Sequence, residues 1–228
     1  MFERLKKVFG QGAPQASGQA PPTDAVSEWA GTQGFTFTGH GADKGFSLTG
    51  KVSNKPWRLE RGRSSRDYIQ GEELRARAEL GINEEAAVLI MNRSLKESLE
   101  KQAYQIYTDH LRTSADPSLP EEMRWLSIYT EVGWDSLPGE FWARYSVLAD
   151  DRQHALAWID QNLAELLLSW PEPGPDEQAP FIMMLLRGKA YLRMQYTPAN
   201  VATLEHAAVI YTSACELALA GLSTDIAL

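Results

Sequence analysis

The stretch ELRARAEL, residues 73–80, alternates apolar and charged side chains with a period of two residues. Leu74, Ala76, Ala78 and Leu80 fall on one side, and the four charged residues fall on the other. This alternation is typical of an antiparallel strand with one face on the core and the other in water. Two of the four apolar residues are small alanines, so we expect a large element to pack over them. The stretch predicts a sheet with one solvent-exposed, charged face.

Shorter stretches before this strand repeat the same two-residue period. Gly-rich and Pro-containing segments separate them, as expected for hairpin turns. The apolar run 86–91 fits either a buried strand or the start of a helix. The predicted strands are FTFT (35–38), FSLT (46–49) and WRLE (57–60), and the predicted turns are GHGADKG (39–45) and SNKP (53–56).

The later part of the chain has helical spacing. A capping box, Ser94-x-x-Glu97, predicts a helix to about residue 111, and Pro120 predicts another helix start. Apolar stripes predict one helix after Asp150-Asp151 that reaches Trp170, and a last helix that ends at Gly221. We predict two more strands, 141–148 and 181–186. The fold class expected is α+β: a mostly antiparallel sheet covered on one face by long amphipathic helices.

The first 25 residues differ from the rest in composition. Phe2, Leu5 and Phe9 lie at helical spacing among basic residues, and GQGAPQASGQAPPTDA (10–25) has no apolar period. We therefore predict a flexible lead over 1–25 and a single α+β domain over 26–228. The basic apolar segment is small, which predicts at most a weak peripheral contact with a membrane surface through its three apolar residues.

Composition limits the class of protein. The chain has 228 residues, of which 43% are hydrophobic, and a single cysteine, which favours a reducing, cytoplasmic location. No apolar stretch is long enough to span a membrane. The net charge is −8, but residues 1–80 carry 12 Lys/Arg against 9 Asp/Glu. General nucleic-acid binding is disfavoured by the overall sign, whereas a local basic surface in the first third is compatible with it.

Arginines gather around Ser64-Ser65 and continue on the neighbouring strand. Several guanidiniums close together would bind a carboxylate or phosphate. The alternative is a solvated strand face whose arginines pair with Glu72, Glu73 and Glu79. Trp57 is a candidate to stack beneath a guanidinium, and Trp134, in the loop 133–139, is a candidate contact aromatic or an inward loop anchor. The candidate anion or partner site consists of Arg58, Arg61, Arg63, Arg66, Arg75 and Arg77.

The sequence carries no recognisable catalytic motif. The spacing of Gly39, Gly41 and Gly45 fits a hairpin turn better than a phosphate loop, because a strand follows it. Asp150, Asp151 and His154 would suit a metal or a hydrolytic site, but two carboxylates at a helix start also serve as caps. Cys215 falls on a buried helical stripe, which favours an inert thiol. We predict no catalytic residue, no metal and no cofactor.

These observations favour a non-catalytic binding or adaptor protein of a bacterial-type cytoplasm. It would contact an acidic protein partner or a small anionic ligand through its arginine-rich strand and loop surface. Two alternatives remain open at this point. One is a hydrolase-like enzyme with a dispersed site around His154, and the other is a homo-oligomeric structural subunit. The sequence does not indicate an oligomeric state.

Overall fold

A computed structural model describes residues 23–41, 44–110 and 121–224 of the chain, without the side chains of 106–110. Most of the predicted lead, including Phe2, Leu5 and Phe9, lies outside the described residues. The first element, α1 (Thr23–Thr32), begins within the range assigned to that lead.

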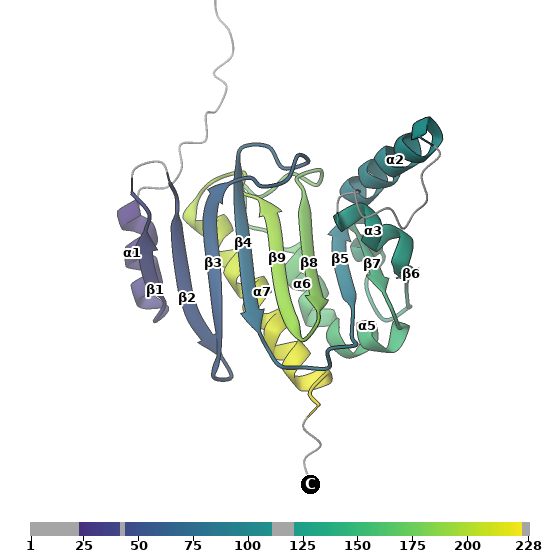
Figure 1. Ribbon diagram of the computed structural model, residues 1–228. Coiled ribbons are helices and arrows are strands. Elements are labelled where there is room, and N and C mark those ends of the chain that lie inside the picture. Colours follow the sequence, from purple (N-terminus) through teal and green to yellow (C-terminus); the bar gives the residue numbers. More distant parts are fainter. Residues whose placement is uncertain (1–22, 42–43, 111–120, 225–228) are drawn as a thin grey trace, which may run out of the picture.

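Nine strands form one sheet in which every pairing is antiparallel. The spatial order is β1-β2-β3-β4-β9-β8-β5-β7-β6, so β4 pairs with β9 rather than with the next strand in the chain. This confirms the α+β class and the antiparallel sheet (Figure 1). The strands are β1 (Thr36–Gly39), β2 (Phe46–Val52), β3 (Lys55–Arg63), β4 (Glu72–Glu79), β5 (Val88–Asn92), β6 (Thr130–Val132), β7 (Tyr145–Ala149), β8 (Phe181–Leu186) and β9 (Lys189–Gln195).

Local chemistry fixes two of the hairpins that build this sheet. Ser53 and Asn54, between β2 and β3, both have positive φ, and Arg187 and Gly188 have positive φ between β8 and β9. Two central residues with positive φ make the tight turn whose twist matches antiparallel strands. The predicted turn at 53–56 is therefore present, and Arg187 and Gly188 form a second hairpin turn.

One face of the sheet is covered along its length. Side chains from five helices pack there on the apolar residues of the strands, and Figure 1 shows α7 running diagonally behind the central strands. The alternation predicted a large element over the small alanines of β4, and α7 places Tyr211 there: its hydroxyl donates to the carbonyl of Ala190, the cross-strand partner of Ala78. The helices on this face are α1, α4 (Gly139–Arg144), α5 (Arg152–Trp158), α6 (Gln161–Leu168) and α7 (Val201–Gly221).

The opposite face is covered at one end only. Helices α2 (Arg93–His110) and α3 (Glu121–Ile128) pack there over β5, β7 and β8, in a smaller core that includes Leu89, Met184 and Trp125. These strands are apolar on both faces because helices lie on both sides of them. Over β2, β3, β4 and β9 no described helix packs on this side, and we call this half of the sheet the open face.

Two predicted elements differ from the structure. The expected strand at 141–148 is a short helix, α4, followed by β7 from Tyr145. The expected helix from Asp151 to Trp170 is two helices, because Asp160 caps a new start by accepting a hydrogen bond from the N–H of Leu163 at 2.8 Å. The ambiguous run at 86–91 contributes a buried strand, β5.

Buried tyrosines predict a loss of stability in alkali. Burial raises the pKa of Tyr68, Tyr196 and Tyr211 well above the ordinary value of 10.0. Above that pH the unfolded chain releases phenolic protons that the folded chain retains, so the free energy of unfolding falls as the pH rises. We expect the urea midpoint to be steady between about pH 8 and 9 and to drop steadily above about pH 10. The Tyr211→Phe variant should show a shallower drop, and a midpoint that is constant through this range would contradict the prediction.

Candidate functional site

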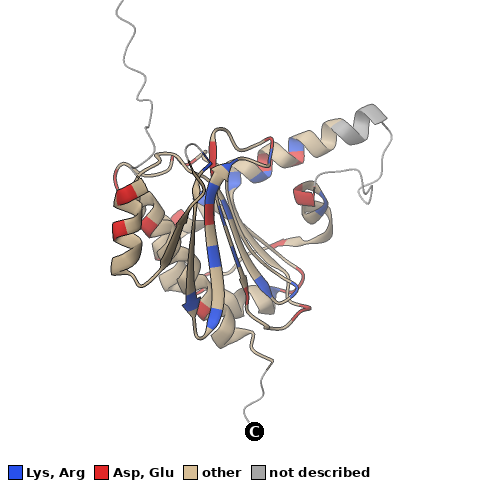
Figure 2. Ribbon diagram, turned by 60° about the vertical axis from the view of Figure 1, so that its left-hand side comes forward, with Lys and Arg blue, Asp and Glu red and all other residues tan. Residues whose placement is uncertain are grey.

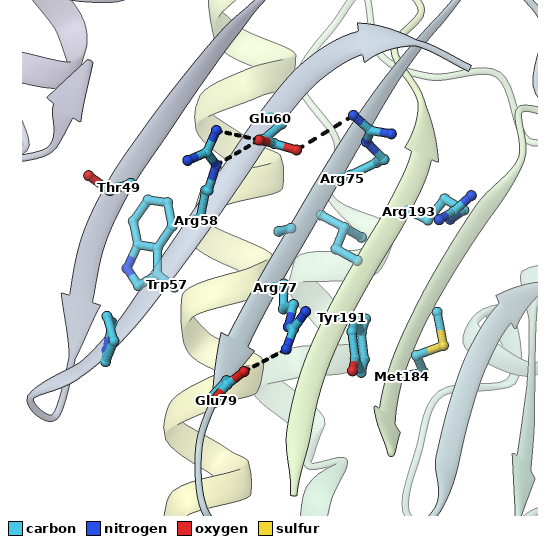
Figure 3. A pocket seen from close by; sticks show the side chains of 13 residues that line it. Thr49, Trp57, Arg58, Glu60, Arg75, Arg77, Glu79, Met184, Tyr191 and Arg193 are labelled. Atoms are coloured by element: carbon cyan, nitrogen blue, oxygen red, sulfur yellow. Dashed lines mark hydrogen bonds and ion pairs between the residues drawn. The ribbon is translucent and has the colours of Figure 1, made fainter. Parts of the chain in front are cut away.

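The open face presents a row of side chains that changes in character from strand to strand. Cross-strand partners place Thr49, Arg58, Arg77, Tyr191 and Met184 side by side across β2, β3, β4, β9 and β8. Figure 3 shows these side chains on the same side of the sheet, with α7 behind it. The row begins with a hydroxyl, continues with two guanidiniums and ends with an aromatic ring and a thioether.

Two pairs of arginines stand directly opposite each other on this face. Arg58 on β3 is the cross-strand partner of Arg77 on β4, and Arg75 on β4 is the partner of Arg193 on β9. Like charges at directly opposed positions destabilise a sheet, by roughly the 0.2–1 kcal/mol that an opposite pair contributes. Since Arg75 and Arg77 are two residues apart on β4, all four guanidiniums belong to one patch.

The open face is positive although the chain as a whole is acidic. Among the described residues, the register of β2, β3, β4 and β9 places six basic and three acidic side chains on it, against a net charge of −8 for the whole chain. Figure 2 shows basic and acidic positions alternating along the central strands. The basic residues are Lys51, Arg58, Arg75, Arg77, Lys189 and Arg193, and the acidic ones are Glu60, Glu73 and Glu79.

Glutamates on the same face hold the arginines in place. The carboxylate of Glu60 lies between two of them: Arg58 Nη2 is 2.5 Å from Oε1, and Arg75 Nη2 is 3.5 Å from Oε2. Glu79 similarly contacts Arg77 at 2.5 Å and Lys189 at 3.4 Å. The side chains of Arg58 and Arg77 nevertheless remain about half exposed, at 52% and 54%, so donors on them remain available to a ligand.

Arg193 is more buried than the other three arginines of the open face, with 18% of its side chain exposed. Its guanidinium is 3.2 Å from the fully buried carboxylate of Glu73 and donates to the Ser65 hydroxyl at 3.0 Å. Arg77 lies over the ring of Tyr191, with 6.0 Å between the guanidinium carbon and the ring centroid. That distance is at the limit of a cation–π contact, so the ring gives the guanidinium an apolar neighbour on one side.

Three adjoining hollows run across the open face. The central one, of about 600 Å³, is lined by Arg58, Arg75 and Arg77. It shares Met184, Tyr191 and Arg193 with a hollow of about 420 Å³ beside α3, whose lining includes Trp125, Tyr129 and Leu186. It shares Glu60 and Arg75 with a third, of about 500 Å³. The three hollows form a track whose third member is cationic, while the second combines apolar side chains with charged ones. The charged residues that line the second hollow are Arg66, Arg187, Arg193, Glu84, Glu85 and Glu121.

The structure brings most of the predicted arginines to this track. Arg58, Arg75 and Arg77 lie on the open face, while Arg61 and Arg63 line the third hollow with Lys44 and His40. Arg61 is also bound to Glu72, its Nε donating to Oε2 at 2.8 Å. The alternative considered for these arginines therefore occurs in part, together with the clustering: Arg61 pairs with Glu72 and Arg77 with Glu79. Glu73 pairs with Arg193 instead.

Arg66 is the predicted arginine that lines the second hollow, beside α3. Its guanidinium binds the carboxylate of Glu122 on α3 and lies 3.7 Å from that of Glu121. The Tyr68 hydroxyl donates to the same Glu122 carboxylate at 3.0 Å. Glu122 is only 2% exposed, so Arg66 and Tyr68 neutralise and hydrogen-bond a buried acid. The loop after β3 is thereby fastened to α3, which forms the wall of the second hollow.

Both candidate contact tryptophans are buried. Trp57 is 2% exposed and packs edge-on against Phe35 and Tyr211 on the helix-covered side, so it does not present a ring to the arginines of the open face. Trp134 is 8% exposed and packs against Trp142. It therefore takes the inward, loop-anchoring arrangement.

The remaining candidates have structural partners. Asp151 caps α5 by accepting from the N–H of Gln153 at 2.8 Å. Asp150 accepts from the N–H of Ala87 and contacts His154 at 3.0 Å. Within the described ranges no three metal-ligating side chains form a group. Cys215 is buried, and burial raises the pKa of its thiol to about 12.

Sequence reasoning missed two residues of the site, Tyr191 and Arg193. The sequence did contain a pattern that could have identified them. In the segment 189–195 polar or aromatic residues alternate with small or apolar ones, and residues 73–80 show the same two-residue period. The pairing of β9 with β4, which brings these side chains beside Arg75 and Arg77, joins segments more than a hundred residues apart.

The chain has no match among protein-family models or curated protein sequences. Among solved structures it resembles the mycobacterial trehalose monomycolate transport factor A, with a TM-score of 0.50 and 12% sequence identity. The likeness covers 88% of this chain and 95% of that one. It is a likeness of fold. In the part of the chain that the structure describes, no helix is long and apolar enough to cross a membrane.

Proposed function

We propose that this protein is a non-catalytic binding or adaptor protein that takes an acidic partner or anionic ligand on its open face. The observation that carries the proposal is the double opposition of Arg58 to Arg77 and of Arg75 to Arg193. An arrangement that costs stability in the free protein is expected at a functional site, where a ligand supplies the missing negative charge.

The surroundings of the four arginines support the same function. Arg61 and Arg63 extend the cationic track at the end of β3, and Tyr191 and Met184 supply apolar contact beside it. Aromatic and arginine side chains together are typical of the energetic centre of a binding surface.

The experiment uses polyglutamate as the probe and the full chain as the receptor. We expect Arg58→Ala to weaken polyglutamate binding about tenfold, measured by calorimetry or anisotropy at low salt. Binding should weaken further as salt rises from about 50 to 200 mM, because these charges lie at the surface. The matched control is Arg152→Ala on α5, which lies with the helices of the covered face and should leave binding unchanged. Equal binding by both variants would contradict the proposal.

The same substitution has a second expected effect, on stability. Replacing Arg58 removes its contact with Glu60 but also relieves its opposition to Arg77. These two effects are of similar size, so the free energy of unfolding should change by no more than about 0.5 kcal/mol. A large loss of stability with unchanged binding would assign these arginines a structural role instead.

A further inference from the structure

We infer that the occupant of the open face is an acidic amphipathic helix of a partner protein; this inference rests on the proposed function. The four opposed arginines lie on β3, β4 and β9, and Tyr191 and Met184 lie next to them on β9 and β8 in the central hollow. Leu186 and Trp125 continue these apolar contacts in the second hollow, among the charged residues that also line it. An occupant that matches both has an acidic stripe beside an apolar stripe. An amphipathic helix carries such stripes at fixed spacing.

The protein itself shows how such a helix binds to this side of the sheet. Helix α3 begins with Glu121 and Glu122, which bind Arg66, while Met123 and Trp125 pack into the core shared with Leu89 and Met184. Acidic residues on an arginine and apolar residues on the strands therefore already hold one helix here. The hollow between α3 and β9 lies along the edge of that helix, where a second helix would pack against both.

Glu60 marks the position of a partner carboxylate. It bridges Arg58 and Arg75 from within the same face. Among the residues that the structure describes, it is also the one acidic side chain that lines the cationic hollow containing Arg61 and Arg63. A carboxylate from the partner would take over these two arginines and release Glu60. Glu60 therefore competes with the ligand, and its removal should strengthen binding.

Charge argues against the chain's own residues 1–22 as the occupant. Residues 1–22 contain three basic residues, Arg4, Lys6 and Lys7, and one acidic residue, Glu3. A basic segment does not complement a basic face. The three hollows are open to solvent, which argues against a small apolar ligand as the occupant, since a small ligand is normally enclosed over most of its surface. A helix brings its own satisfied backbone and would cover the open strands.

The test uses synthetic peptides and the full chain. The first peptide, of about 18 residues or five helical turns, places leucines on one stripe and glutamates beside it. The second has the same composition in an order that abolishes the stripes, and the third replaces every glutamate with lysine. We expect the first to bind at least about tenfold more tightly than the second, with a gain of helicity on binding, and the third not to bind.

Variants of the protein test whether the apolar stripe of the peptide contacts the apolar side chains of the open face and whether its acidic stripe contacts the arginines. Tyr191→Ala should weaken the striped peptide about tenfold and leave the scrambled one unchanged, since only the striped peptide uses the apolar side. Glu60→Gln should strengthen the striped peptide several-fold. Arg152→Ala again serves as the control, and each variant's thermal midpoint is measured to confirm that it folds.

Three results would overturn the inference, and they separate it from the proposed function. Equal binding of the striped and scrambled acidic peptides would reject a helix as the occupant but keep the proposal that the open face binds anions. Arginine-dependent binding of phosphatidylglycerol vesicles without binding of the striped peptide would replace the helix with a lipid surface. Failure of polyglutamate, both acidic peptides and vesicles to bind would reject the proposed function together with the inference.

Discussion

Replacing Arg75 and Arg77 together with alanine is expected to weaken binding of an acidic partner about 100-fold and to leave the fold intact. Both residues are on β4, at the centre of the open face, and each stands opposite another arginine. A hydrogen bond to a charged group contributes about 1.5–3 kcal/mol, and the lower value applies where the guanidinium is partly exposed. Two such losses give about 3 kcal/mol, or roughly two orders of magnitude in the dissociation constant.

The comparison that tests this prediction uses a control variant with the same change in net charge. The Arg152→Ala/Lys101→Ala variant also removes two basic residues, and both lie outside the track, on α5 and α2. It should bind polyglutamate and the striped peptide as the parent does. If both double variants lose affinity equally, the effect comes from net charge alone and the open face is not the binding site.

Replacing Arg66 with alanine is expected to produce the largest loss of stability among single arginine substitutions. The carboxylate of Glu122, 2% exposed, would keep the Tyr68 hydroxyl and lose its charged partner. Removing one member of a buried ion pair costs about 3–5 kcal/mol. Because Arg66 is 31% exposed and water can enter in its place, we expect about 3 kcal/mol. The melting temperature should fall by roughly 8 °C.

A double substitution shows whether the buried charge is the cause. Adding Glu122→Gln to Arg66→Ala removes the uncompensated carboxylate and should recover part of the lost stability, measured by urea unfolding. The single Glu122→Gln variant completes the cycle. If the two substitutions simply add, the pair is not coupled, and the loss at Arg66 must come from side-chain packing alone.

The strands of the sheet could be predicted where one face is solvent-exposed, because apolar and polar residues alternate there. Residues 73–80 and 57–60 alternate because water lies on one side and helices on the other, and the structure extends both as β4 and β3. At Phe141–Tyr145 nearly every residue is apolar, so the sequence has no period from which to separate a helix from a strand. There Pro138 and Gly139 begin a helix, which the apolar composition alone did not indicate.

The break at Asp160 carried a readable signal that the apolar stripe concealed. Aspartate is a preferred N-cap residue, and the structure uses Asp160 as one, its carboxylate accepting from the backbone N–H of Leu163. The stripe of apolar residues continued across this point because α5 and α6 face the same core. A continuous buried face therefore does not establish a continuous helix.

The candidate site was predictable in part. The alternation in residues 73–80 places Arg75 and Arg77 on the wet face, and the structure agrees. The opposition of Arg58 to Arg77 depends on the register between β3 and β4, which a hairpin of known length largely determines. The arrival of Arg193 opposite Arg75 depends on a pairing distant in sequence, for which the residues themselves contain no local signal.

The buried thiol makes site-specific labelling straightforward. Cys215 is the one cysteine of the chain, it is fully enclosed, and its raised pKa keeps it protonated at neutral pH. A maleimide dye reacts with accessible thiolate, so it should pass over this residue. A cysteine introduced at Thr49, beside Arg58, would then be the sole labelling position. A fluorophore there would report directly when the face is occupied, without any change to the native cysteine.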